Sequence, residues 1–156
     1  METKNIIKFF KPLPLNGSSS LSILLLRVVV GLAFILHGWV KIQNPTGWLG
    51  PDATTPGIFQ FLAAISEFGG GIALVLGIIV PIASLGIIST MIVAVLKLIS
   101  QFNFPFVSNT GGGSFELPLT YLCISILIFA MGPGKYSLDY IIFGGRTRNN
   151  TTTENE

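Results

Sequence analysis

Four long apolar stretches dominate this chain and leave few folds open to it. They cover about residues 21–40, 58–80, 82–100 and 115–131. A transmembrane helix needs roughly 20 mostly apolar residues, because a helix rises ~1.5 Å per residue and the hydrocarbon core is ~30 Å thick. Hydrophobic residues make up 50% of the chain, charged residues only 10%, and the mean hydropathy is +0.72. We therefore predict an all-α polytopic membrane protein, a bundle of four transmembrane helices.

A chain of 156 residues has little room for anything besides these helices. We expect one membrane domain over residues 21–142, between a cytoplasmic N-terminal tail (1–20) and a polar C-terminal tail (143–156). The net charge of +2 is too small to indicate nucleic acid as a partner. Cys123 is the single cysteine, which excludes a disulfide or a paired-thiol relay within the chain. Redox chemistry would therefore need a cofactor or a partner.

The positions of the basic residues predict the orientation of the bundle. Cytoplasmic segments next to membrane helices carry an excess of Lys and Arg. Here the basic residues that precede the first stretch or follow the last are Lys4, Lys8, Lys11, Lys135, Arg146 and Arg148. Both termini should therefore be cytoplasmic. The two longer connections, residues 41–57 and 101–114, should then lie on the outer side of the membrane.

A few ionisable side chains lie within the apolar stretches or at their ends: Arg27, His37, Glu67, Lys97 and Glu116. An ionised group near the membrane centre costs at least ~2.5 to 3.5 kcal/mol, so such groups usually face the bundle interior, pair, or line a polar cavity. In the expected orientation Arg27 falls in the inner half of the membrane. The other four fall in the outer half, one on each helix. We predict that they converge there on a polar site.

Helical phase indicates which face of the first stretch is packed. At about 100° per residue, one narrow stripe contains Arg27, Gly31, Phe34, Gly38 and Lys41. In the second stretch Glu67 is followed closely by Gly70 and Gly71. Small residues let membrane helices approach closely. We therefore expect the charged face of each of these helices to be its packed face.

Each ionisable residue has a functional and a structural interpretation. Glu67 could carry protons or belong to a buried network that sets helix register. His37 could exchange protons near neutral pH or be an ordinary polar residue at the membrane interface. Lys97 could pair with a carboxylate or extend to the headgroups. Glu116 could bind a cation or be an acid stabilised at a helix start.

The sequence does not predict a metal or nucleotide site. His37, Glu67 and Glu116 are few ligands for a metal ion, and no two of them have the i, i+3 or i, i+4 spacing of helical metal sites. The glycines at 111–113 are not followed by the Gly-Lys-Ser/Thr of a phosphate-binding loop, and no dinucleotide fingerprint occurs. We expect no metal and no covalently bound cofactor.

Four short segments occur in a characteristic order: LRVVVGLAFILHG (26–38) followed by Lys41, EFGGG (67–71), GGSFELPL (112–119) and GPGKYSLD (132–139). Over about residues 21–142 the chain resembles the DoxX family of small four-span bacterial membrane proteins. The resemblance implies a multi-pass protein of the bacterial plasma (inner) membrane. Some members look like subunits of quinone-linked oxidoreductases or of complexes that handle sulfur compounds and oxidative stress. The resemblance supports a site that includes Arg27, His37, Glu67 and Glu116, without assigning their roles.

The first functional hypothesis is a small subunit of a membrane oxidoreductase system with a polar pocket for a quinone-like or similarly amphipathic ligand. In this hypothesis Glu67 and His37 exchange protons, His37 and Lys41 hold a carbonyl oxygen, and Glu116 orients a cation. The full set of expected ligand-binding residues is Arg27, His37, Lys41, Glu67, Lys97 and Glu116. Such a protein would be part of an enzyme rather than a complete one.

The second hypothesis is a non-enzymatic membrane anchor or scaffold that recruits a soluble protein. The cytoplasmic segment 132–148, with Tyr136, Asp139 and Tyr140, would then carry the function, and the buried charges would only hold the helices together. A solute or proton pathway is less consistent with the sequence, because one charge per helix does not form a continuous row of polar groups across the membrane. The expected surroundings are thus the lipid bilayer and an oxidoreductase or soluble partner, and the sequence is compatible with an oligomer.

Overall fold

The computed structural model describes residues 13–109 and 111–144, which form helices and no strand. The elements are α2 (Gly17–Ile42), α3 (Gly57–Leu76), α4 (Val80–Ser100), α5 (Glu116–Met131) and a short π-helical turn, η1 (Tyr140–Gly144). The predicted all-α class is confirmed. Helices α2, α3 and α4 are long and apolar enough to cross a membrane, whereas α5 is apolar but only 16 residues long. That α5 also crosses the bilayer stays a prediction.

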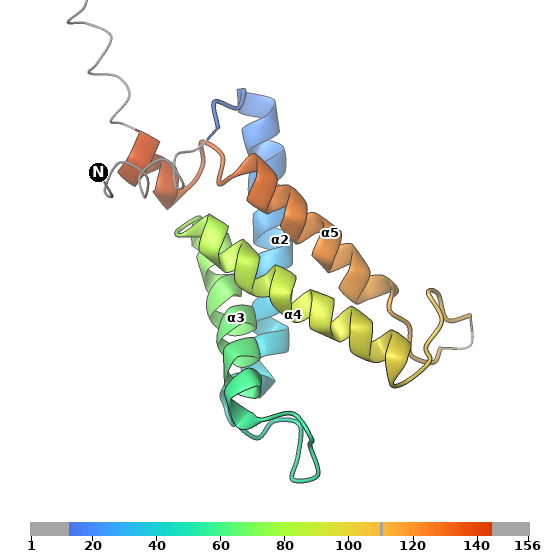
Figure 1. The fold of residues 1–156 in the computed structure, drawn as a ribbon. Coiled ribbons are helices and arrows are strands. Elements are labelled where there is room, and N and C mark those ends of the chain that lie inside the picture. Colours follow the sequence, from blue (N-terminus) through green and yellow to red (C-terminus); the bar gives the residue numbers. More distant parts are fainter. Residues whose placement is uncertain (1–12, 110, 145–156) are drawn as a thin grey trace, which may run out of the picture.

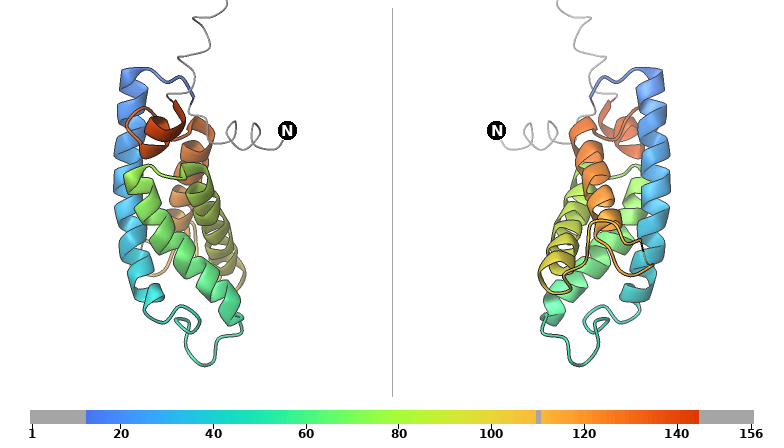
Figure 2. Two further views of the ribbon diagram at one scale, coloured as in Figure 1. Left: turned by 90° about the vertical axis from the view of Figure 1, so that its left-hand side faces the viewer. Right: turned by 90° about the vertical axis from the view of Figure 1, so that its right-hand side faces the viewer.

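The helices pack as two antiparallel pairs (Figure 1). Helix α2 packs along α3 and α4 along α5, while α3 also contacts α4 and α2 touches α5 only slightly. Both long connections lie at one end of the bundle, called here the loop end (Figure 2). The tight α3–α4 turn, the C-terminal end of α5 and η1 lie at the other end, called here the turn end. Of the basic residues that predict the orientation, only Lys135 lies within the described residues, so the orientation itself stays a prediction.

Helix α2 begins four residues before the apolar stretch that predicts it. The side-chain oxygen of Asn16 accepts a hydrogen bond from the backbone N–H of Ser19, at 2.8 Å. This is an N-cap, which satisfies one of the amide groups left unpaired at a helix start. The polar Gly-Ser-Ser-Ser segment is therefore the first turn of the helix rather than part of a tail.

Pro81 separates the apolar stretches 58–80 and 82–100, which predicts a very short connection and an antiparallel helical hairpin. The structure has this hairpin, but its turn lies at residues 77–79, before Pro81. Gly77 ends α3 in the left-handed region, with φ +70° and its N–H donated to the carbonyl of Ala73 at 2.8 Å. A glycine is favoured there because it has no Cβ to clash. Pro81 then lies in the first turn of α4, where its missing N–H costs no helical hydrogen bond.

The packed face of α2 is the one that helical phase predicts. Arg27, Gly31, Phe34 and Gly38 are all buried. The backbones of α2 and α3 are in contact, since a Cβ added to Gly31 would lie only 2.7 Å from the carbonyl oxygen of Gly71. Side chains from all four helices complete the core, the most enclosed being Val30, Phe34, Leu74, Val80, Ile87 and Ile128.

Candidate functional site

An ion pair joins α2 and α3 near the loop end. Nζ of Lys41 lies 2.6 Å from both carboxylate oxygens of Glu67. The side chain of Glu67 is 4% exposed and that of Lys41 is 21% exposed. The ammonium also lies 4.5 Å from the ring centre of Trp48, which adds a cation–π contact. A carboxylate this buried needs such a cation, because an uncompensated charge in the interior is costly.

A second cation, Lys97, projects from the last turn of α4. Its Nζ donates a hydrogen bond to Oγ1 of Thr55, in the connection between α2 and α3, at 2.8 Å. Lys97 is half-buried. Among the residues that the structure describes, the one ion pair is that of Lys41 with Glu67, so Lys97 has no carboxylate partner there.

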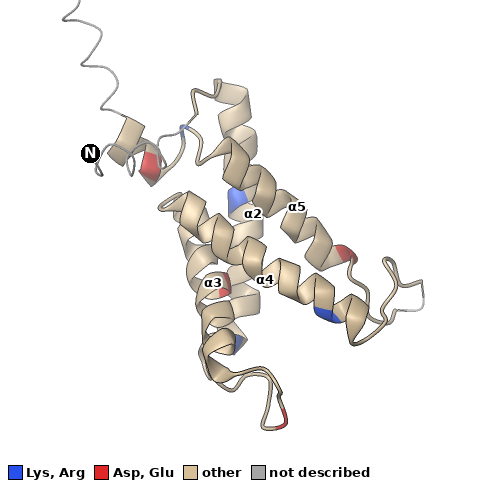
Figure 3. Ribbon diagram, viewed as in Figure 1, with Lys and Arg blue, Asp and Glu red and all other residues tan. Residues whose placement is uncertain are grey.

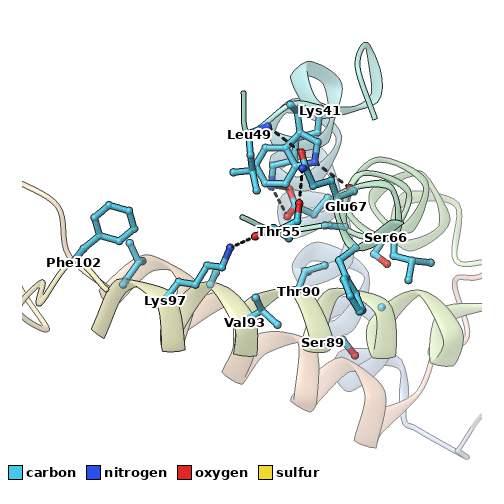
Figure 4. Close-up of a pocket in the computed structure, with 18 residues that line it drawn as sticks. Lys41, Leu49, Thr55, Ser66, Glu67, Ser89, Thr90, Val93, Lys97 and Phe102 are labelled. Carbon is cyan, nitrogen blue, oxygen red and sulfur yellow. Dashed lines mark hydrogen bonds and ion pairs between the residues drawn. The ribbon is translucent and has the colours of Figure 1, made fainter. Parts of the chain in front are cut away.

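A pocket of about 500 Å³ lies between these two cations (Figure 4). It is formed by α3, by α4, by the C-terminal end of α2 and by the connection between α2 and α3. Its polar lining is Lys41, Thr55, Gln60, Ser66, Glu67, Ser89, Thr90 and Lys97. The remaining lining is mainly apolar or aromatic and includes Trp48, Phe59, Leu62, Val93, Leu98 and Phe102. A mostly apolar pocket of this size with a few polar groups is typical of sites for small organic ligands.

Gln60 holds the α2–α3 connection over the pocket. Its side chain donates to the carbonyl of Thr55 at 2.9 Å and accepts from the N–H of Leu49 at 3.1 Å. The indole N–H of Trp48 donates to the backbone carbonyl of Gln60 at 3.0 Å. Gln60 and Thr55 are not among the residues predicted from the sequence. A lone Gln in the first turn of an apolar helix was the available signal, since a buried amide needs hydrogen-bond partners.

The structure brings Lys41, Glu67 and Lys97 to this pocket but not His37 or Glu116. His37 is exposed on α2, and its ring centre lies 6.3 Å from that of Tyr121 on α5. Glu116 is exposed at the first position of α5, where the helix dipole favours an acid. Within the described residues no three His, Cys, Asp or Glu side chains come close enough to hold a metal ion.

Arg27 lies at the turn end and belongs to a different cluster. Its side chain is 1% exposed and donates hydrogen bonds to three backbone carbonyls, those of Leu74 at 2.9 Å, Tyr136 at 3.1 Å and Pro133. These carbonyls belong to the end of α3 and to the segment after α5. Arg27 therefore ties that segment to α2 and α3.

Asp139 completes the cluster at the turn end from the segment after α5. Its carboxylate is fully buried and accepts the backbone N–H groups of Ile79 at 2.8 Å and Val80 at 2.9 Å, at the start of α4. The opposite charges of Arg27 and Asp139 also attract each other. Asp139 is thus inside the fold, whereas Tyr136 and Tyr140, named with it in the anchor hypothesis, are exposed. The helices otherwise carry few charged residues (Figure 3).

Comparisons with known proteins give the family. The family model named DoxX matches residues 22–99, which is half of the chain and contains Lys41, Glu67 and Lys97. The chain is 26% identical over 140 residues to "Putative oxidoreductase CatD" of Bacillus subtilis (strain 168), covering 88% of this chain and 99% of that protein. It is 29% identical over 127 residues to "Inner membrane protein YqjF" of Escherichia coli (strain K12), covering 77% of this chain and 91% of that protein. No solved structure matches. The chain is therefore a multi-pass membrane protein and belongs to the DoxX family.

Proposed function

We propose that the pocket between α3 and α4 binds a quinone-like ligand, and that the protein is a small subunit of an oxidoreductase system in the bacterial plasma membrane. The observation that carries this proposal is the pocket itself, which is mainly apolar but has ammonium groups on Lys41 and Lys97. A quinone has an apolar ring and tail and carbonyl oxygens that accept hydrogen bonds. The name of the relative CatD supports an oxidoreductase system. The name of the relative YqjF supports a location in the inner membrane.

Each charged group in the pocket has a role in this proposal. Lys97 donates a hydrogen bond to an oxygen of the ligand, in place of or beside Thr55. Lys41 and Glu67 form the second polar group, where Glu67 holds or releases a proton as its pairing with Lys41 changes. Reduction of a quinone takes up two electrons and two protons, and the electrons come from a redox-active partner subunit. His37 and Glu116, outside the pocket, have no contact with the ligand in this arrangement.

The proposal is tested by the small molecules that remain bound to the protein. Wild type and Glu67→Gln are extracted gently from their native membrane and analysed by mass spectrometry. We expect a quinone in near-stoichiometric amount in the wild type and its loss from Glu67→Gln. Glu116→Gln is the matched control, because it removes an equivalent charge outside the pocket and should retain the quinone. The absence of a quinone from folded wild type, or its equal retention in Glu67→Gln, would contradict the proposal.

A filled pocket gives an independent test. Val93 lines the pocket on α4 and is itself 53% exposed, so a larger side chain can be accommodated without disrupting the core. We expect Val93→Trp to reduce quinone retention and to leave the protein folded. Leu36→Trp, a change on the exposed face of α2, should leave retention unchanged.

One observation favours a second function, that of a membrane anchor. Tyr136 and Tyr140 are exposed at the turn end, 53% and 38%, on a segment that Arg27 and Asp139 hold in a defined position. A rigid segment with exposed aromatic side chains suits protein recognition. If this function is present, Tyr136→Ala with Tyr140→Ala should abolish recovery of a soluble partner while quinone retention is unchanged. Equal recovery of the soluble partner with the wild type and with the double variant would reject the anchor function.

A further inference from the structure

The charges that line the pocket do not balance. Lys41 and Glu67 neutralise each other through two contacts of 2.6 Å. Lys97 is the other charged residue of the lining and has no carboxylate within ion-pair distance among the described residues. The described lining therefore carries one net positive charge, which is located at Lys97.

The surroundings of Lys97 leave its ammonium group undersatisfied. The group has three N–H donors. Within the described part of the chain, the hydrogen bond found for it is to the neutral hydroxyl of Thr55. The neighbouring lining is apolar or aromatic and comprises Val93, Ala94, Leu98 and Phe102. A half-buried cation gains more from an anionic oxygen than from a hydroxyl, because a charge-assisted hydrogen bond is about twice as strong as a neutral one.

We infer that the ligand of this pocket is an amphipathic anion, with a negatively charged oxygen bound to Lys97 and an apolar body against α3 and α4. The inference rests on the proposed function for the location of the site and adds the charge of the ligand. In a quinone-like ligand the anionic oxygen is an ionised hydroxyl on the ring. The Lys41–Glu67 pair, already neutral, is left to contact the uncharged part of the ligand.

The test compares two probes that differ by one methyl group on the ring oxygen, which removes the negative charge. One is a long-chain hydroxynaphthoquinone, whose ring hydroxyl is ionised at neutral pH, and the other is its methyl ether, which stays neutral. Binding to the purified protein in detergent is followed by quenching of Trp48, which lines the pocket. The chain has two tryptophans, so the measurement uses Trp39→Phe as the reference protein. Trp39 packs against Phe68 and is outside the pocket lining.

We expect the reference protein to bind the anion about tenfold more tightly than the ether, which corresponds to roughly 1.4 kcal/mol. Lys97→Gln should remove this preference, because it weakens the binding of the anion and leaves the binding of the ether unchanged. Lys97→Arg should keep the preference. Lys135→Gln, which removes an exposed lysine at the turn end, should bind both probes as the reference does. Size-exclusion chromatography and circular dichroism check that each variant is folded.

The outcomes separate this inference from the proposed function. If both probes bind alike and Val93→Trp blocks both, the quinone site stands and the anionic ligand is rejected. A preference for the anion that persists in Lys97→Gln also rejects it. Binding of a long-chain fatty acid that is lost in Lys97→Gln, while neither quinone probe binds, supports the anionic ligand and rejects the quinone. If no probe binds, both proposals fail.

Discussion

At the scale of the residue, Glu67 is the clearest case of a side chain that depends on one partner. Its carboxylate is almost completely buried on the packed face of α3, and both oxygens contact Lys41. Removing one member of a buried pair leaves the other charge uncompensated, which costs more than replacing both members. The pair therefore stabilises the α2–α3 contact whether or not a ligand binds beside it.

The Lys41–Glu67 pair can be tested by a double-mutant cycle. We expect Lys41→Met to lower the free energy of unfolding by about 1–3 kcal/mol, less than for a fully enclosed pair because the lysine is partly exposed. Lys41→Met combined with Glu67→Gln should recover part of this loss, since no buried charge then remains. The measurement is unfolding in detergent, with Glu116→Gln as the control. Additive losses from the two changes would show that the residues do not interact.

At the scale of the element, close contact between α2 and α3 depends on glycine. A Cβ on Gly71 would lie 2.7 Å from the carbonyl oxygen of Gly31 and 2.8 Å from the amide nitrogen of Ile35. These are backbone atoms, which cannot move without separating the helices. Gly69, two residues earlier on the same helix, has room, because a Cβ there would meet only a side-chain carbon of Ile65 at 3.8 Å.

These two glycines give a matched comparison within one helix. We expect Gly71→Ala to destabilise the protein by about 1–3 kcal/mol, the usual cost of overpacking. Gly69→Ala should be neutral or stabilising by up to about 1 kcal/mol, because alanine has the higher helix propensity. Thermal unfolding of both variants under identical conditions measures the difference. Equal effects would mean that α2 and α3 are not in backbone contact.

In the molecule as a whole, the two ends of the bundle differ in what their polar residues do. The loop end contains the pocket, which is lined by the ammonium groups of Lys41 and Lys97 (Figure 4). The turn end contains Arg27 and Asp139, whose polar atoms are occupied by backbone groups of three elements. The proposed ligand site and the structural cluster are thus separate, and each should respond to its own substitutions.

Asp139→Asn tests this division. The amide has one oxygen where the carboxylate has two, so one of the N–H groups of Ile79 and Val80 loses its acceptor. We expect a loss of stability of about 1–3 kcal/mol and faster hydrogen exchange in residues 132–144. Ligand retention at the pocket should match that of the wild type. Reduced retention in folded Asp139→Asn would show that the two ends are coupled.

The orientation of the bundle is testable with single cysteines in a Cys123→Ser background. Thr46 lies in the α2–α3 connection at the loop end, and Lys135 lies at the turn end; both are exposed. The distribution of basic residues predicts that the loop end faces outward. We therefore expect a membrane-impermeant maleimide to label Thr46→Cys in intact cells and Lys135→Cys only after lysis. The reverse labelling pattern would show that the bundle has the opposite orientation in the membrane.

Features that depend on neighbours along the chain are predictable from the sequence alone. Hydropathy predicted the helices and the all-α class, and helical phase predicted the packed face of α2, because both are set by spacing of a few residues. The break at Pro81 predicted the hairpin for the same reason. One local signal was missed, the Asn16 cap that moves the start of α2 to Gly17.

Contacts between side chains that are distant in the sequence are seen only in the folded structure. It brought Lys97 to a pocket shared with Lys41 and Glu67, directed His37 toward α5, and buried Asp139 against a turn 60 residues earlier in the chain. Periodicity shows which face of a helix is buried, but not which helix covers that face, at what angle, or how a connection folds over the gap. These depend on the contacts between backbones at glycines and on buried hydrogen bonds such as those of Gln60, which form only when distant segments have packed.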